Sequence, residues 1–296
     1  METMCKKHAI CITAHKNWEQ LKDLIETVSS NSTDIFLHVD KKSRDSFDKY
    51  FDNITLNIND NLYLINSKSV DWGGYSQLVV ELDLFREVLK NKEKYTYVHL
   101  ISGQDFPIKP IDKIIEECER TKFDYISFIS DKNKGRYEKR LRYKHIMVEN
   151  IRTSKFADLL RKAYLVIQMV MGVNLMKPFG LKFQVGANWV SLTIDSLLYI
   201  VEHFPKYEKL FSSGLSAEEC YKQMILQTKV DARIMNNCRR FVIFPKNAPS
   251  PINLTMQLYD DIMNSDAFFA RKFDDSVDKE IRILIMNKIH KEQHER

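Results

Sequence analysis

Three groups of polar residues stand where binding of a charged ligand is expected. Thr13–Lys16, Asp40–Ser43 and Ser102–Asp105 each follow a short apolar run that resembles a buried strand. In a parallel sheet, ligands bind outside the carboxyl ends of the strands, and loops that follow neighbouring strands meet there. The sequence therefore predicts a nucleotide site at this edge, and it leaves the identity of the ligand open.

No signature motif identifies that ligand. The sequence has no G-x-x-x-x-G-K-[ST] or G-x-G-x-x-G loop, no H-E-x-x-H and no G-x-S-x-G. It also lacks an Asp-x-Asp at a strand end, which many nucleotide-sugar enzymes use to hold a divalent metal. We interpret the acidic pairs at 260–261 and 274–275 as solvated or capping residues. His15, His38 and His99 lie at strand ends without ligand-like partners, so we expect no metal site and no cofactor.

Strand-like and helix-like segments alternate through the first half of the chain. The expected strands are Ala9–Ala14, Ile35–Val39, Leu62–Ile65 and Tyr95–Ile101, and the expected helices follow His15–Asn17, cover Asp45–Phe51 and run from Ser76 to about Leu89. This alternation indicates an α/β fold with a mostly parallel central sheet flanked by helices.

The second half is less regular. Val185–Thr193 resembles a strand with a glycine entry, and a helix follows from about Ile194. Ser216 and Glu219 have the spacing of a capping box that opens a helix through Thr228. We expect one domain over residues 1–296, divided into residues 8–130, residues 131–275 and a C-terminal helix (276–296).

Composition limits the class of protein. The 296 residues are 44% hydrophobic and 29% charged, with a net charge of +5, which is too mild for a dedicated nucleic-acid binder. Five cysteines are scattered without a C-x-x-C pair, so we expect a reducing compartment. The start lacks the apolar region of a signal peptide, and no run approaches the roughly eighteen apolar residues of a spanning helix. A cytoplasmic protein is expected.

Six motifs follow one another along the chain. They are His38-Val-Asp-Lys-Lys-Ser43, Trp72-Gly-Gly-Tyr-Ser76, His99-Leu-Ile-Ser-Gly-Gln-Asp-Phe-Pro-Ile-Lys109, Gly186-Ala-Asn-Trp-Val190, Ala217-Glu-Glu219 and Phe269-Ala-Arg-Lys-Phe-Asp274. Together they resemble the core-2/I-branching β-1,6-N-acetylglucosaminyltransferases (glycosyltransferase family 14) and the related peptide O-xylosyltransferases. Each motif is weak alone, but they occur in the family's order and span roughly residues 8 to 275. The resemblance implies a GT-A-like fold and an inverting, metal-independent sugar transfer from a UDP-sugar. It also implies that 8–130 is a nucleotide-binding half and that 131–275 is an acceptor and catalytic half.

The resemblance assigns the catalytic base to Glu219. A base must reach the acceptor hydroxyl and be ionised, which a position in the first turn of a helix favours. The alternative role for Glu219 is that of a capping-box glutamate, and Glu218 beside it is the reserve candidate for the base.

The donor-binding residues implied are Ile12, Thr13, Asp40, Trp72, Arg271 and Lys272. Lys272 matches a lysine on the diphosphate, and Asp40 matches the residue that binds uridine; their alternatives are a surface basic pair and a strand-end turn aspartate. The family's second phosphate-binding arginine has no counterpart in residues 249–253, and Arg239 or Arg240 is a candidate replacement.

The acceptor-binding residues implied are Arg136, Arg140, Trp189 and Glu218, with Lys139 near them. Aromatic faces pack against sugar C–H surfaces, and core packing is an equal alternative for Trp189. The segment Phe156–Met171 is apolar and basic. It suits contact with a membrane or a lipid-linked acceptor, and a core helix is the slightly favoured alternative.

We therefore expect a glycosyltransferase that moves a sugar, with UDP-N-acetylglucosamine as the expected donor, to a glycan or lipid-linked glycan in surface polysaccharide synthesis. Its place would be the cytoplasm or the inner face of the membrane. The alternatives are a UDP-xylose-dependent xylosyltransferase and a non-catalytic nucleotide- or carbohydrate-binding protein of the same fold. No nucleic acid is expected as a partner.

Overall fold

The computed structural model describes residues 6–52, 54–56, 61–146, 148, 155–246, 248 and 250–294, without the side chains of 131, 133, 136, 155 and 294. Its helices are α1 (Trp18–Val28), α2 (Arg44–Phe51), α3 (Tyr75–Leu89), α4 (Ile111–Thr121), α5 (Asp131–Arg142), α6 (Lys155–Val170), α7 (Ile194–Ser212), α8 (Tyr221–Leu226), α9 (Tyr259–Met263) and α10 (Lys279–His294). Its strands are β1 (Lys7–Ala14), β2 (Thr33–Val39), β3 (Leu62–Leu64), β4 (Tyr95–Ser102), β5 (Asp105–Pro107), β6 (Asp124–Tyr125), β7 (Ser191–Thr193), β8 (Ile234–Met235), β9 (Arg240–Phe241) and β10 (Phe269–Arg271).

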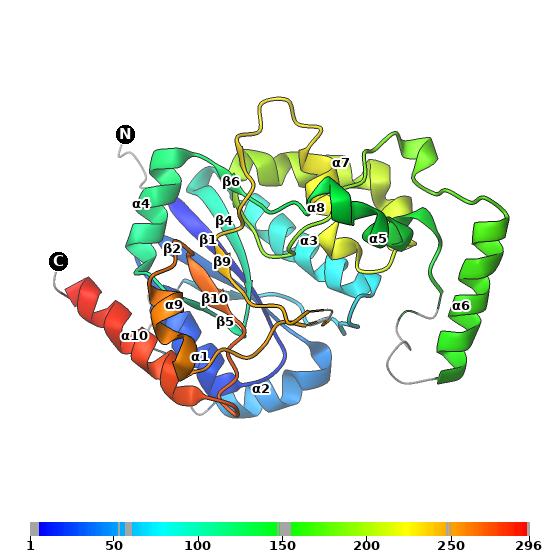
Figure 1. The fold of residues 1–296 in the computed structure, drawn as a ribbon. Coiled ribbons are helices and arrows are strands. Elements are labelled where there is room, and N and C mark those ends of the chain that lie inside the picture. Colours follow the sequence, from blue (N-terminus) through cyan, green and yellow to red (C-terminus); the bar gives the residue numbers. More distant parts are fainter. Residues whose placement is uncertain are drawn as a thin grey trace.

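A seven-stranded sheet forms the centre of the molecule, in the order β3-β2-β1-β4-β7-β6-β8 (Figure 1). The pairs from β3 to β4 are parallel, β7 is antiparallel to both of its neighbours, and β8 is parallel to β6. The prediction of a mostly parallel central sheet flanked by helices is confirmed, and this arrangement is consistent with a GT-A-like fold.

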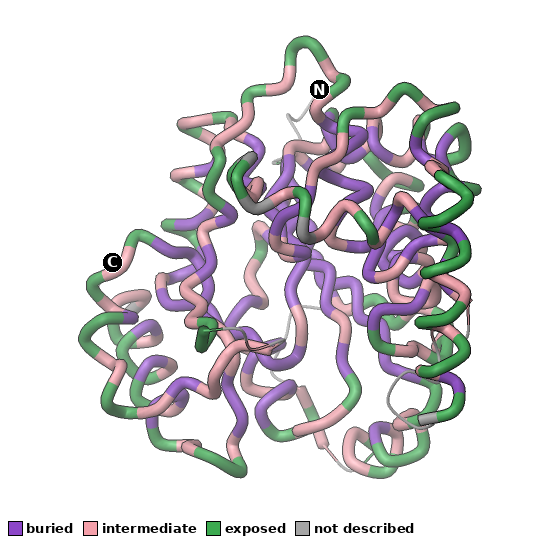
Figure 2. The backbone as a smooth tube through the Cα atoms, turned by 45° about the vertical axis from the view of Figure 1, so that its right-hand side comes forward, coloured by how far each residue is buried: buried purple, intermediate pink, exposed green. Residues whose placement is uncertain are grey.

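Hydrophobic side chains fill both faces of the sheet. Alternate residues of β1 point to opposite faces, so Ala9 and Cys11 join the core with α3, α7 and α8, whereas Ile10 and Ile12 join the core with α1, α4 and α10. Both faces are covered, which is why β1 reads as a continuous apolar run. Figure 2 shows the buried backbone running through the middle of the molecule, with exposed stretches around it.

A second, three-stranded sheet is formed by β5, β10 and β9. Strand β10 pairs antiparallel with β5, so Arg271 lies opposite Asp105, and it pairs parallel with β9 on its other side. This sheet fixes the position of the Arg271–Lys272 segment, and it was not predicted from the sequence.

Three local predictions are wrong or only partly correct. The expected strand over Val185–Thr193 is a strand only at Ser191–Thr193. Ser216 makes no capping hydrogen bond from its side chain and has a left-handed backbone (φ 49°), so the expected capping box is a 3₁₀ turn, Ala217–Glu219, before the short helix α8. The favoured core role for Phe156–Met171 is also wrong, because most apolar side chains of α6 are exposed.

Among the helices of the described ranges, none combines the length and the apolar character needed to cross a bilayer. The longest, α7, has 19 residues and carries Pro205 within it.

Candidate active site

The loops after β1, β2 and β4 meet at one edge of the sheet, as predicted. The backbone N–H of Asp40 donates to the carbonyl of Ala14 over 2.9 Å, and the N–H of Gly103 donates to the carbonyl of Thr13 over 2.9 Å. These hydrogen bonds continue the parallel ladders past the ends of the strands. The three polar loops therefore lie side by side along one edge of the sheet.

The segment that follows β10 packs against two of these loops. The N–H of Phe273 donates to the carbonyl of Gln104 over 2.8 Å, in the loop after β4. Asp274 accepts from Lys16 over 2.6 Å and from Asn17 over 3.1 Å, in the loop after β1. Burial raises the pKa of Asp274, but hydrogen bonds from Lys16, Ser276 and Asn17 outweigh it and hold the pKa well below its usual range. Lys272 is thus held at the carboxyl edge of β1 and β4.

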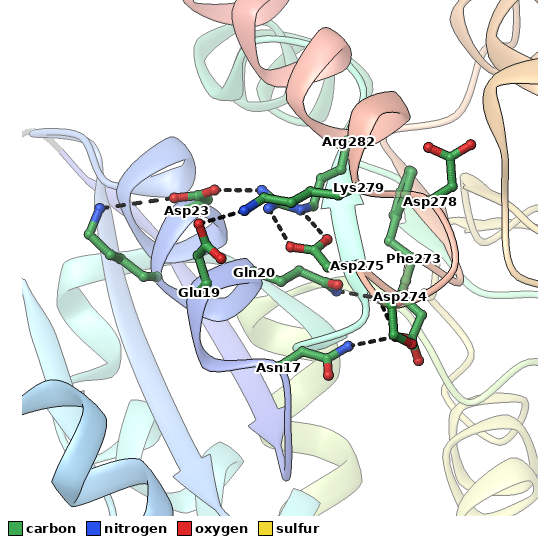
Figure 3. A network of polar contacts seen from close by, with 12 residues as sticks. Asn17, Glu19, Gln20, Asp23, Phe273, Asp274, Asp275, Asp278, Lys279 and Arg282 are labelled. Carbon is green, nitrogen blue, oxygen red and sulfur yellow. Dashed lines mark hydrogen bonds and ion pairs between the residues drawn. The ribbon is translucent and has the colours of Figure 1, made fainter.

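A buried arginine of α10 anchors the same segment (Figure 3). Arg282 is 0% exposed, and its guanidinium donates to Asp275 over 2.8 and 2.7 Å and to Asp23 of α1 over 2.6 Å. The acidic pair at 274–275 is therefore structural and not solvated. Asp274 also accepts from the backbone N–H of Ser276 over 3.2 Å, which agrees with the capping role considered for the pair. Helix α10 ties the Lys272 segment to α1 through these two carboxylates.

Asp40, His15 and Lys272 lie within electrostatic reach of one another. Burial lowers the pKa of His15, the charges of Lys16 and Lys272 lower it further, and Asp40 opposes them. Asp40 also accepts a hydrogen bond from the backbone N–H of Lys42 over 2.9 Å, which is the turn role considered for it. The predicted donor-binding residues Thr13, Asp40 and Lys272 are thus neighbours around one edge.

Arg271 contacts two other residues of interest. Its Nε lies 3.3 Å from Oδ1 of Asp105, and its guanidinium carbon lies 4.3 Å from the ring centre of Trp189. Burial lowers the pKa of Arg271, and the charges of Asp105, Cys238 and Glu219 oppose this. One face of Trp189 is therefore covered by a cation, and Glu219 lies close enough for its charge to act on that cation.

Glu219 is positioned by two chain segments that dock on it. Its carboxylate forms an ion pair with Arg140 of α5, and its side chain remains 38% exposed. Its carbonyl accepts from the N–H of Gly186 over 2.9 Å. A Cβ at Gly186 would lie 1.7 Å from the carbonyl oxygen of Ser127, so the close approach of these backbones requires glycine.

Trp72 lies beside the same turn. It is 47% exposed, and the next residue, Gly73, has a φ of +72° that favours glycine. The carbonyl of Gly73 accepts from the N–H of Ser216 over 2.8 Å. The loop with Trp72 is therefore fixed against the turn that carries Glu219.

A buried polar cluster lies behind Glu219, and the sequence did not predict it. Lys222 is 0% exposed and donates over 2.6 Å both to Glu81 of α3 and to the amide oxygen of Asn188. Tyr221 donates to Glu81 as well, over 3.1 Å. Burial raises the pKa of Glu81 and lowers that of Lys222, although each group opposes the shift of the other. The cluster joins α3, the turn before β7 and α8.

Glu218 points into the same buried region. It is 4% exposed, and its Oε2 has no hydrogen-bond partner among the described residues. Burial raises its pKa to about 8, with the negative charges of Glu219 and Glu81 adding to the effect. A carboxyl group with this pKa is protonated at neutral pH, so Glu218 is a poorer candidate for the base than its exposed neighbour.

One other expected position is wrong, and one is not tested. Ile12 is completely buried between Leu37 and Ile101 of the adjacent strands, so its side chain cannot contact a ligand. Arg136 belongs to α5, but its side chain lies outside the described residues.

The two candidate replacements for the second phosphate-binding arginine are engaged elsewhere. Arg240 is 7% exposed and donates to the carbonyls of Cys238 and Val190 over 2.7 and 3.0 Å. Arg239 pairs with Glu117 over 2.9 Å and also with Asp266. Both guanidinium groups are thus occupied by partners within the protein, which argues against either arginine as the replacement.

Two histidines and a cysteine form a buried cluster beside the sheet. The ligand atoms of His8, His99 and Cys118 lie within 4.8 Å of one another, in contrast to the expectation that His99 has no such partners. Contacts of 3.1 Å from His8 to Glu119, 2.9 Å between the two imidazoles and 2.8 Å from His99 to Ser191 link these groups in a chain. Burial lowers the pKa of both histidines, and neutral tautomers satisfy every one of these contacts.

Comparisons with known proteins agree on one family. A family model described as "Core-2/I-Branching enzyme" matches residues 9–261. The human N-acetyllactosaminide beta-1,6-N-acetylglucosaminyl-transferase is 28% identical over 109 residues, which cover 36% of this chain and 27% of that protein. Xylosyltransferase oxt of Drosophila pseudoobscura pseudoobscura is 26% identical over 168 residues, which cover 54% of this chain and 17% of that protein. The matches therefore span about a quarter and a sixth of these relatives.

Proposed function

Because the chain belongs to the core-2/I-branching enzyme family, we propose that it is an inverting glycosyltransferase that moves a sugar from a UDP-sugar to a glycan or a lipid-linked glycan. The observation that supports the proposal is that Arg271, which lies within reach of the charge of Glu219, is followed directly by Lys272 at the carboxyl edge of β1 and β4. A carboxylate and two cations are the groups that deprotonation of an acceptor and departure of a diphosphate need.

Glu219 is the proposed general base. It takes the proton of an acceptor hydroxyl while that oxygen forms a bond to the anomeric carbon, and the bond from this carbon to the diphosphate oxygen breaks to release UDP. The 38% exposure of Glu219 allows an acceptor to approach, and the ion pair with Arg140 orients the carboxylate. Trp72 and Trp189, on segments close to the same turn, are proposed to contact the sugars.

Lys272 and Arg271 are the proposed partners of the diphosphate. Negative charge develops on the leaving phosphate oxygens, and preorganised cations stabilise it most in a partly dry site. Arg271 is largely buried, and Lys272 is fixed through its neighbours Phe273 and Asp274. We propose that these two cations replace the divalent metal of metal-dependent glycosyltransferases.

The donor we propose is UDP-N-acetylglucosamine, as the name of the human relative suggests. UDP-xylose is the second candidate, because the relative with the longer matched region is a xylosyltransferase. We propose surface polysaccharide synthesis as the setting. A reducing compartment is supported by Cys11, Cys118, Cys220 and Cys238, which are buried and unpaired.

Titration with UDP and a panel of UDP-sugars tests this proposal. Thermal shift and calorimetry with EDTA or with Mn²⁺ should give the same UDP affinity, and the best-binding sugar should support UDP release with glycan acceptors. Binding that requires Mn²⁺ would contradict the role of Lys272 and Arg271. Tight UDP binding without turnover of any donor would favour a non-catalytic binding protein.

A further inference from the structure

Helix α6 presents its apolar side chains to solvent. Six side chains of α6 and its end are more than half exposed, namely Phe156, Leu159, Val166, Ile167, Val170 and Met171. Except for Met171, which follows the last turn, their spacing along the helix places them on one face. Figure 1 shows α6 at the right-hand edge of the molecule, away from the central sheet.

The opposite face of α6 is directed toward the protein, and it carries polar side chains beside Ala157 and Leu165. Gln168 is buried, and its amide accepts from the N–H of Lys144 over 2.8 Å and donates to the carbonyl of the same residue over 2.9 Å. Arg161, with a side chain 15% exposed, pairs with Asp158 over 2.6 Å. A surface helix of a globular protein normally has the reverse polarity. The hydrogen bonds between Gln168 and Lys144 therefore hold α6 in the orientation that leaves its apolar face in solvent.

The region around α6 carries an excess of positive charge. Residues 131–182 contain thirteen Lys and Arg against four Asp and Glu, whereas the rest of the chain contains 32 against 36. Lys162, on the flank of the apolar face, is 65% exposed. Lys134, Lys177 and Lys182 line a groove between α5 and the segment that follows α6. The overall net charge of +5 thus combines a strongly basic stretch of sequence, 131–182, with a remainder in which acidic residues outnumber basic ones.

We infer that the outward face of α6 is a docking surface for an anionic lipid bilayer, with the helix lying in the plane of the membrane interface. Sixteen residues of α-helix span about 24 Å, less than the hydrocarbon core of about 30 Å. An apolar face on a helix within a basic segment of the chain is the combination that binds anionic membrane surfaces. A second copy of the chain is disfavoured as the occupant, because it would bring another basic surface against this one.

Sedimentation with vesicles of two lipid compositions tests this docking surface, whichever sugar the protein transfers. Wild-type protein should sediment with vesicles of phosphatidylglycerol and phosphatidylcholine, and not with phosphatidylcholine alone, and binding should weaken as salt increases. At the same lipid concentration, the fraction of the double variant Val166→Glu/Val170→Glu that sediments with vesicles should be roughly tenfold lower than that of the wild type, or lower still.

Val230→Glu is the matched control, because Val230 is fully exposed in the turn after α8. It should bind vesicles like the wild type, and UDP binding of all three proteins should show that the fold and the nucleotide site are intact. Equal vesicle binding by the double variant and the wild type, or no wild-type binding to phosphatidylglycerol, would overturn the inference. So would a dimer, measured by light scattering, that dissociates only in the double variant.

Discussion

Replacing Glu218 by Gln should stabilise the protein increasingly as the pH rises. Glu218 is 4% exposed and ionises in the folded state only near pH 8, whereas its ordinary pKa is 4.5. Burial is the main cause, Glu219 and Glu81 add repulsion, and Lys222 offsets part of both. Folding therefore takes up a proton between these two pH values, and the stability contributed by the protonated carboxyl is lost as the pH rises.

The size of the effect follows from the width of that interval. Each pH unit between 4.5 and 8 should cost the wild type about 1.4 kcal/mol of unfolding free energy, which Glu218→Gln does not lose. The advantage of the variant should grow by about 2 kcal/mol from pH 4.5 to pH 6 and by about 4 kcal/mol up to pH 8. Urea unfolding followed by tryptophan fluorescence at several pH values measures this difference.

Glu119 offers a control of opposite sign. Its hydrogen bond with His8 lowers its pKa to about 2, burial opposes this, and Lys122 and Thr96 lower it further. Glu119→Gln should therefore be destabilising above pH 4.5, and the loss should shrink as the pH falls toward 2. A stability difference between wild type and Glu218→Gln that is the same at pH 5 and pH 8 would refute the reasoning on Glu218.

Three further changes test the packing and the donor site. Lys222→Met should cost about 3–5 kcal/mol in urea unfolding, since it leaves the Glu81 carboxylate buried without its cation, and additivity with Glu81→Gln would contradict the coupling of the pair. Gly186→Ala should lower the melting temperature and UDP release together, because its Cβ would meet the carbonyl of Ser127; an unchanged Tm would show that the backbone yields easily. Lys272→Ala should weaken UDP binding and turnover in parallel, as measured by calorimetry and UDP release, and normal UDP affinity would remove Lys272 from the diphosphate site.

The first half of the fold was largely predictable because its signals are local. The apolar runs at Ala9–Ala14, Ile35–Val39 and Tyr95–Ile101 are strands β1, β2 and β4, with bounds that differ by at most two residues. The periodic segment from Ser76 is helix α3. Buried parallel strands produce continuous apolar runs, and the polar loops after them mark the ligand edge without any long-range information.

The second half depends on contacts between distant residues, which local patterns do not contain. Ser216 and Glu219 have the spacing of a capping box, yet hydrogen bonds to Gly73 and Gly186 hold this segment as a 3₁₀ turn. For helix α6 a core position was slightly favoured over contact with a membrane, and composition alone cannot say which face is directed outward.

The candidate site also combines residues that local patterns or resemblance indicate with residues that only distant contacts bring together. Asp40 and Lys272 were singled out by resemblance. Asp40 lies at the edge predicted from the parallel strands, whereas Lys272 reaches this edge through the second sheet, which was not predicted. The ion pair between Glu81 and Lys222 joins residues 141 positions apart, and the burial of Glu218 depends on that packing. In the sequence, nothing distinguishes Glu81 from the other charged residues of the amphipathic helix α3.

The most direct test of the account is UDP release by Glu219→Gln, with Glu202→Gln on α7 as the matched control. With the donor and acceptor selected by the panel, Glu219→Gln should lower kcat by about 10²- to 10⁴-fold, while calorimetry should show UDP bound as tightly as by the wild type. Glu202→Gln should change neither quantity. Full turnover by Glu219→Gln, or a loss of UDP affinity as large as its loss of turnover, would contradict the assignment of the catalytic base.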